Sequence, residues 1–332
     1  MTPIDIIKRA FDNTVANWQL LLVRIALSVA ILVIALGAAV AVVIPLAISA
    51  GLSKFSPRGA DAAAILTTLV TEHWLILLYI VIVASVVLGL LCLLYSFAQS
   101  GSARIYLDAE AAAGGAVVPG RDRFAVFDPQ RWFQGAVQGS WRVFWIYNIG
   151  WTVALATILV PLVFVPVIIY LGGGSTMAIV AGCGLLLLIG ALFLLLVLMT
   201  DAVIWKAIAI AIGRDIGAVD SLRAAIGDFR ADFSRNFTVV FIMLVVHIGG
   251  TAILGIMSIA GSMGQRMPGI SLVFVPTQIV SSLVQAVFSA FMESWVLAAF
   301  IALDAERSRS LQRPELRNQP SVITEVIRIN PR

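Results

Sequence analysis

Charged side chains are scarce in this sequence. Lysine, arginine, aspartate and glutamate make up 12% of the 332 residues, while hydrophobic residues make up 61%. Soluble domains contain about 25% charged residues. Residues 25–53, 73–103 and 143–200 carry no lysine, arginine, aspartate or glutamate at all. This composition excludes a soluble globular protein and predicts an all-α, polytopic membrane protein.

Cysteine, histidine and catalytic motifs are equally rare. The two cysteines, Cys92 and Cys183, lie inside apolar stretches, which is typical of small core residues and not of a disulfide framework. No HExxH, CxxC, GxSxG or P-loop pattern occurs. We therefore expect a protein that is not an enzyme and that holds no resident cofactor or metal.

What is present is a series of long apolar runs. Each is long enough for a membrane helix, which needs about 20 residues. The first run is too long for a cleaved signal peptide. The runs predict six transmembrane helices at 19–49, 74–98, 143–171, 177–200, 237–260 and 270–292.

The distribution of positive charge predicts the orientation. Of 22 lysines and arginines, only Lys54, Arg58 and Arg266 fall on the side opposite the termini. Because cytoplasmic loops are enriched in these residues, both termini are expected in the cytoplasm, at a bacterial inner membrane. The net charge of +4 then describes a membrane surface, and no nucleic-acid partner is expected.

Charged, amphipathic segments precede three of the apolar runs, at 5–18, 128–141 and 220–233. In the third, apolar residues recur at helical spacing on one face, which is typical of an interfacial helix. Asp128 is a candidate N-cap with Pro129 in the first helical position.

The three segments have the same internal spacing. One interval separates Asp5 from Trp18, Asp128 from Trp141 and Asp220 from Phe233. A longer interval, also constant, leads from Asp128 to Asp201 and from Asp220 to Glu293, and a longer first loop accounts for the greater distance from Asp5 to Gln99. We predict one membrane domain over 1–306, built of three repeats at 5–115, 128–215 and 220–306. A polar, flexible cytoplasmic tail is expected over 307–332.

The segment AVDSLRAAIGDFRADFSRNF at 218–237, followed by a span, resembles the membrane domain of the glycerophosphoryl diester phosphodiesterase family and related uncharacterised bacterial six-helix membrane proteins. The resemblance extends over the repeated helix-hairpin plan of 1–306. It implies a membrane module without the phosphodiesterase domain that can follow it in that family.

Polar residues near the ends of spans are the main candidates for a site. Asp201 and Glu293 occupy equivalent repeat positions, with Gln99 as the uncharged third member, on helices that stay apolar afterwards. A carboxylate there is costly unless it is paired or hydrated. One interpretation is a substrate site between repeats, and the other, which we favour, is structural ion pairing. The possible partners are Arg24, Arg142 and Arg235.

His247 lies well inside the fifth predicted span. An imidazole there is a candidate ligand for the metal of a haem or chlorin, although a hydrogen-bonded core histidine is the commoner case. The only other histidine, His73, is placed near the opposite surface, too shallow for a close pair.

Three functions are compatible with these features. The first is a non-enzymatic accessory or scaffold protein that contacts membrane lipids and other membrane proteins, or forms a homo-oligomer. The second is a transporter of small solutes or lipids, with a polar site between repeats. The third is a subunit of a larger redox or photosynthetic membrane complex.

Overall fold

The protein is described by a computed structural model that covers residues 1–49, 74–114, 120–171, 176–265 and 271–318. Within these ranges the chain is helical and contains no strand. The elements are α1 (Pro3–Ala16), α2 (Gln19–Ser49), α4 (Trp74–Ala113), η1 (Arg121–Phe124), α5 (Pro129–Leu171), α6 (Thr176–Arg214), α7 (Ala218–Ala231), α8 (Phe233–Gln265) and α9 (Ser271–Asn318).

Several of these helices are long and apolar enough to cross a membrane. In the described part of the chain there are five such segments: Gln19–Ile44, Leu77–Ala113, Leu188–Arg214, Phe233–Ile256 and Ile279–Ser310. The span expected at 143–171 lies in α5, where the side chains from residue 158 onward are outside the described part. An all-helical membrane protein is therefore confirmed.

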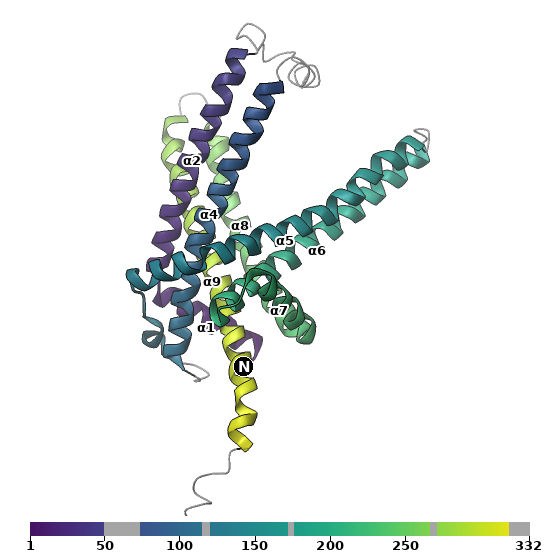
Figure 1. Cartoon of the computed structure of the whole chain (residues 1–332). Helices are drawn as coiled ribbons and strands as arrows, with labels where there is room; N and C mark the ends of the chain where they lie inside the picture. The colour runs from purple at the N-terminus through teal and green to yellow at the C-terminus, as the bar shows by residue number, and fades with distance from the viewer. Residues whose placement is uncertain (50–73, 115–119, 172–175, 266–270, 319–332) are drawn as a thin grey trace, which may run out of the picture.

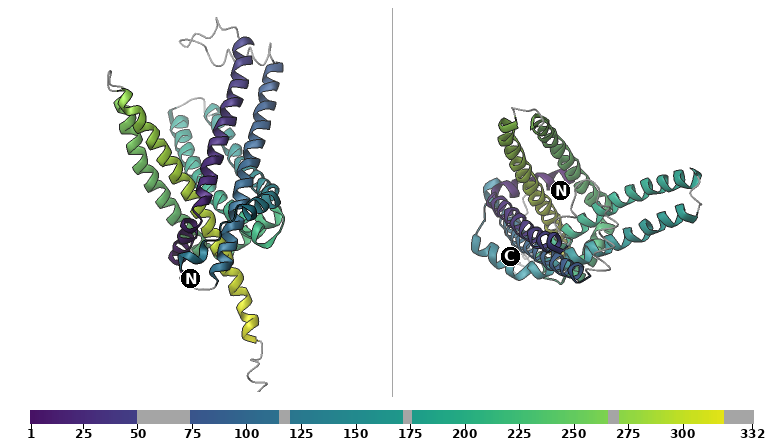
Figure 2. Two further views of the ribbon diagram at one scale, coloured as in Figure 1. Left: turned by 90° about the vertical axis from the view of Figure 1, so that its left-hand side faces the viewer. Right: turned by 90° about the horizontal axis from the view of Figure 1, so that it is seen from above.

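Three helical hairpins, α2–α4, α5–α6 and α8–α9, diverge from a common base (Figures 1 and 2). Seen from above, they point in three different directions (Figure 2, right). The most apolar windows of α2 and α4 contain no buried residue. We call the three hairpins arms. They contact one another mainly near the base.

The hydrophobic core lies in the base. It is formed where α4, α6 and α9 continue beyond their apolar arms and contact one another. Tyr106 of α4, Ile208 of α6 and Phe300 of α9 are among its fully buried side chains. The short helices α1 and α7 add their apolar faces, with Ile6 and Phe229 in the same cluster. The charged amphipathic segments of the sequence therefore cover a core and do not lie alone on a surface.

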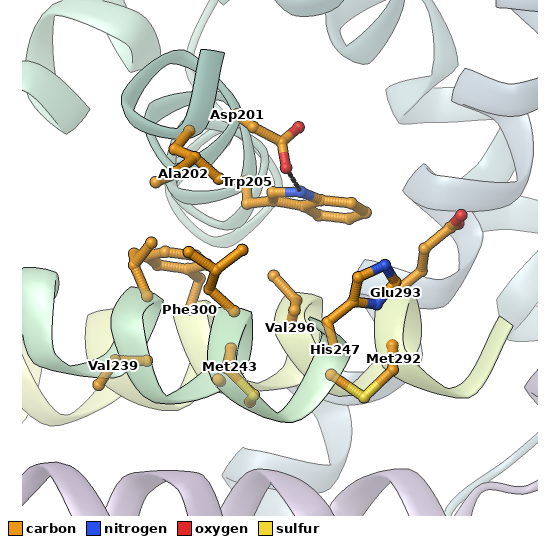
Figure 3. A pocket seen from close by; sticks show the side chains of 14 residues that line it. Asp201, Ala202, Trp205, Val239, Met243, His247, Met292, Glu293, Val296 and Phe300 are labelled. Atoms are coloured by element: carbon orange, nitrogen blue, oxygen red, sulfur yellow. Dashed lines mark hydrogen bonds between the residues drawn. The ribbon is translucent and has the colours of Figure 1, made fainter. Parts of the chain in front are cut away.

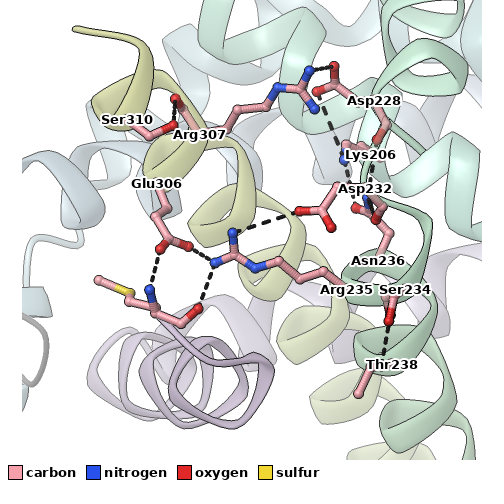
Figure 4. Close-up of polar contacts among 11 residues, drawn as sticks. Lys206, Asp228, Asp232, Ser234, Arg235, Asn236, Thr238, Glu306, Arg307 and Ser310 are labelled. Carbon is pink, nitrogen blue, oxygen red and sulfur yellow. Dashed lines mark hydrogen bonds and ion pairs between the residues drawn. The ribbon is translucent and has the colours of Figure 1, made fainter. Parts of the chain in front are cut away.

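Buried ion pairs hold the base together as well. Arg9 of α1 lies 2.8 Å from Glu110 of α4, and both side chains are almost fully buried. Asp228 of α7 pairs with Arg307 of α9 at 3.0 Å (Figure 4). Arg307, the first residue of the expected tail, thus contacts the base, and α9 continues from there as a helix to Asn318.

Two buried asparagines fix the breaks between an amphipathic helix and its span. Asn17 ends α1 and donates from Nδ2 to the carbonyl oxygen of Phe124 (2.8 Å). Asn236 follows the end of α7, donates to the carbonyl oxygen of Asp232 (2.7 Å), and accepts from Lys206 Nζ (2.7 Å; Figure 4). Carbonyl groups at the end of a helix have no hydrogen-bond partner within the helix, and these asparagines supply one. The bonds therefore fix the direction in which the chain leaves each helix.

The second amphipathic segment has no such break. The sequence predicts a separate interfacial helix at 128–141, but these residues are the first turns of α5, which runs unbroken from Pro129 to Leu171. The predicted start is confirmed, since Asp128 Oδ1 accepts from the backbone N of Gln130 (2.9 Å). The other two helices begin two residues earlier than their acidic markers, at Pro3 and Ala218.

Glycines bring α5 against α4 in the base. A Cβ on Gly135 would lie 2.5 Å from Cβ of Arg104, and one on Gly139 would lie 2.0 Å from Oγ of Ser100. Small residues four apart allow such close approach of two helix backbones. Ser100 Oγ uses this proximity to donate to the carbonyl oxygen of Gly135 (2.6 Å). The α4–α5 crossing therefore depends on the absence of side chains at these positions.

We expect Gly135→Ala to destabilise the protein, because the new methyl group meets a β-carbon that is fixed to its backbone. Overpacking of this kind costs about 1–3 kcal/mol. The matched control is Gly89→Ala, where nothing lies within 4 Å of an added Cβ and alanine favours the helix by about 0.5–1 kcal/mol. Thermal unfolding of both variants in one detergent checks this. Equal melting temperatures for the two would contradict the close crossing.

Candidate functional site

A polar node lies where three of the long helices meet at the top of the base. Arg24 of α2 lies 2.8 Å from Oε2 of Glu293 on α9 and donates from Nη2 to Oε1 of Gln99 on α4 (2.6 Å). Arg24 and Gln99 are buried, and Glu293 is partly exposed. The guanidinium group of Arg24 thus holds together Gln99 and Glu293, two of the three polar residues that occupy equivalent positions in the repeats. Arginine is suited to this role because its planar group presents several donors at once.

Tyr95 completes this node on the side of α4. Its hydroxyl group donates to Oε2 of Glu293 (3.1 Å), and its ring meets that of Tyr147 edge-on at 5.4 Å. Tyr95 lies one helical turn before Gln99, so both side chains share a face of α4. The sequence reasoning missed Tyr95, although this spacing could have indicated it.

Asp201, the remaining repeat-equivalent residue, is not part of an ion pair among the described residues. Its Oδ2 accepts a hydrogen bond from Nε1 of Trp205, one turn further along α6 (3.0 Å). The two other arginines proposed as partners lie elsewhere: Arg142 pairs with Asp215, and Arg235 pairs with Glu306. The carboxylate of Asp201 is therefore compensated by a neutral donor and by no cation among the residues that the structure describes.

A cavity of about 230 Å³ lies between α6, α8 and α9 (Figure 3). Asp201 and Trp205 line it from α6, opposite Met243 and His247 of α8 and Phe300 of α9. Most of the lining is aliphatic or aromatic. The polar groups are gathered near one end, so the cavity has the distribution of an amphipathic site.

A second cavity, of about 290 Å³, lies between α2, α4 and α9. Arg24, Tyr95 and Gln99 line it, together with small residues of α9. Glu293 lines both cavities. The ion pair between Arg24 and Glu293 therefore stands in the wall that the two cavities share.

His247 lies beside the first cavity and has no hydrogen bond to any residue that the structure describes. Its ring stacks on that of Phe288 at 6.0 Å. Among the described residues no group of three or more histidine, cysteine, aspartate or glutamate side chains is placed to hold a metal ion. His73 lies outside the described part, so a pairing of the two histidines has no structural description.

Comparison with family models, with curated proteins and with solved structures finds no match. The base, the arms and the two cavities are therefore the features from which a function is inferred.

The contact between Arg24 and Glu293 predicts a large difference between two arginine substitutions. Arg24→Met leaves a carboxylate without its cation, which costs about 3–5 kcal/mol in a fully buried pair and somewhat less here because the Glu293 side chain is 39% exposed. Arg223→Met is the control, since that side chain is 80% exposed and its one ion pair among the described residues is with Asp220; exposed pairs are worth about 0–1 kcal/mol.

Unfolding by a denaturing detergent would measure both variants. The double variant Arg24→Met, Glu293→Leu should recover much of the loss, because no buried charge is then unpaired. An Arg24→Met protein as stable as Arg223→Met would show that the node contributes nothing to stability.

Proposed function

We propose that the protein is a non-enzymatic scaffold of the bacterial inner membrane, which holds membrane lipids and other membrane proteins, or further copies of itself, between its three hairpin arms. Six spans in three repeats, with both termini in the cytoplasm, form part of this proposal. The observation that carries it is the divergence of apolar arms from a single packed base (Figure 2).

The arms offer contact faces that the chain itself leaves uncovered. On α2, Leu32, Leu36 and Val40 lie one turn apart on one face, and each is more than half exposed. On α6 and α8, Leu192 and Ile256 are equally exposed. Apolar faces of this size are compatible with stable folding only where lipid tails or other apolar helices surround them.

Equivalent placement of three polar residues supports the repeats. Gln99, Asp201 and Glu293 each lie on the second helix of a hairpin, at the point where its apolar arm gives way to the base. An amphipathic helix that packs on the base also precedes the first and third hairpins, and the second hairpin begins with the amphipathic first turns of α5. The same base contains most of the arginines of the described residues, which by the positive-inside rule favours a cytoplasmic location for it.

A transporter of small solutes or lipids is the second candidate, and one observation favours it. Glu293 lies between two cavities and is held by the guanidinium group of Arg24 and the hydroxyl group of Tyr95. A change of partner for this carboxylate would alter the wall that separates them. The contacts of Arg24 with Glu293 and Gln99, however, link α2, α9 and α4, so loss of the ion pair is expected to unfold the node before it opens a path.

Photo-crosslinking in native membranes tests the scaffold. A photoreactive side chain at Leu36, on an exposed arm face, should give adducts with lipid or membrane protein. The same group at Arg223, on the solvent-facing side of α7, should give none with either. Solute flux through proteoliposomes tests the transporter hypothesis. That hypothesis would replace the scaffold if the protein forms no adduct at Leu36 and if Glu293→Gln abolishes a measured flux without lowering stability.

A further inference from the structure

The cavity between α6, α8 and α9 has a property that the scaffold role does not require. Asp201 lines it as an acceptor whose charge no cation of the described chain neutralises. A carboxylate accepts about four hydrogen bonds, and within the described ranges a single donor, the indole of Trp205, is in place. A carboxylate removed from water without a cation is costly. The site is therefore electrostatically incomplete.

The side chains around Asp201 favour an organic cation over a metal ion. Trp205 is buried, and its ring is held in place by the hydrogen bond to Asp201 while it extends across the cavity (Figure 3). The face of an indole is the strongest aromatic partner for an ammonium group. A carboxylate beside an indole face is thus suited to an alkylated ammonium, which has few or no protons for further hydrogen bonds.

The rest of the lining indicates what the cation carries. His247 and Glu293 also line the cavity, and Glu293 is already paired with Arg24. Met243, Val296 and Phe300 form the apolar part of the wall. They offer dispersion contacts and no hydrogen bonds, so the substituent is apolar. At about 230 Å³ the cavity is smaller than the pockets of about 300–1,000 Å³ that hold drug-sized ligands, so the chain inside it must be short.

We propose that this cavity binds an organic ammonium ion with a short apolar substituent, with the ammonium between Asp201 and the face of Trp205. The ammonium group belongs either to a free amphiphilic amine or to the head group of a lipid. This site goes beyond the scaffold role, since a scaffold needs no small ligand. If the cavity proved to bind no ammonium ion, the proposal that the exposed arm faces contact lipids or membrane proteins would still stand.

Calorimetric titration of the full chain in an uncharged detergent tests the site, with protein-free micelles as the blank. The probe is hexyltrimethylammonium, and hexanol is its uncharged counterpart. We expect the cation to bind at least about tenfold more tightly than hexanol. Asp201→Asn should weaken binding of the cation by at least about tenfold, since an amide keeps the shape and removes the charge. The matched control, Asp220→Asn, changes an exposed aspartate of α7 and should leave binding unchanged.

Trp205→Phe provides a second variant, which retains Asp201, offers a weaker aromatic face and removes the indole donor to the carboxylate. It should weaken binding of the cation several-fold and leave that of hexanol nearly the same. Should Asp201→Asn fail to fold, this variant decides alone. The proposal would be overturned if wild type and Asp201→Asn bound the cation equally well. If Asp201→Asn does not fold, equal binding by wild type and Trp205→Phe would overturn it. Equal binding of the cation and of hexanol by wild type would also do so.

Lipid composition distinguishes the two sources of the ammonium group. In nanodiscs of phosphatidylglycerol alone the probe should bind with full affinity. Adding phosphatidylcholine, whose ammonium is fully alkylated, should reduce the difference in probe binding between wild type and Asp201→Asn in the same membrane if the head group of a lipid is the natural occupant. It should leave that difference unchanged if a free amine is. Either result supports the site, whereas absence of probe binding in both membranes would contradict it.

Discussion

The packing of α4, α6 and α9 against one another in the base is the interaction on which the rest of this structure depends. In lipid, apolar arms gain little by contacting each other, because lipid tails are as apolar as leucine. The arms can therefore diverge, and the base must supply the fixed geometry. It does so with a hydrophobic core and with ion pairs such as Arg9 to Glu110. These pairs fix the geometry because separating the partners would leave a buried charge unpaired.

The position of the candidate site follows from this arrangement. Where three hairpins leave a common base, the helices separate and side chains no longer fill the space between them. The two cavities lie at this level, on either side of Glu293. The polar residues found there serve two purposes. Arg24, Gln99 and Glu293 tie helices together, whereas Asp201 and Trp205 line a cavity that extends beyond their own hydrogen bond.

Much of the architecture can be predicted from the sequence, because hydropathy directly reports membrane helices and helical periodicity reports amphipathic segments. The contact of Glu293 with Arg24 was among the expected alternatives, since both lie at similar depth.

The partner of Arg142 was not predictable. Its choice depends on α5 being unbroken and on the turn after α6, where Asp215 has a φ of 53°. Aspartate tolerates that conformation better than most residues, but the sequence does not reveal the angle between hairpins that brings the turn to Arg142. The location of the core in the base was missed for a similar reason, as periodicity shows which face is apolar but not what covers it.

A pair of truncations tests most directly whether stability resides in the base. Ile208 is fully buried in the base, and Leu36 is 58% exposed on the arm of α2. Unfolding by a denaturing detergent, measured for Ile208→Ala and Leu36→Ala under the same conditions, should show a loss of about 2–5 kcal/mol for the first and a change within about 0.5 kcal/mol for the second. A loss at Leu36 equal to or greater than that at Ile208 would contradict the account, because the arms would then pack on each other and not diverge from an independently stable base.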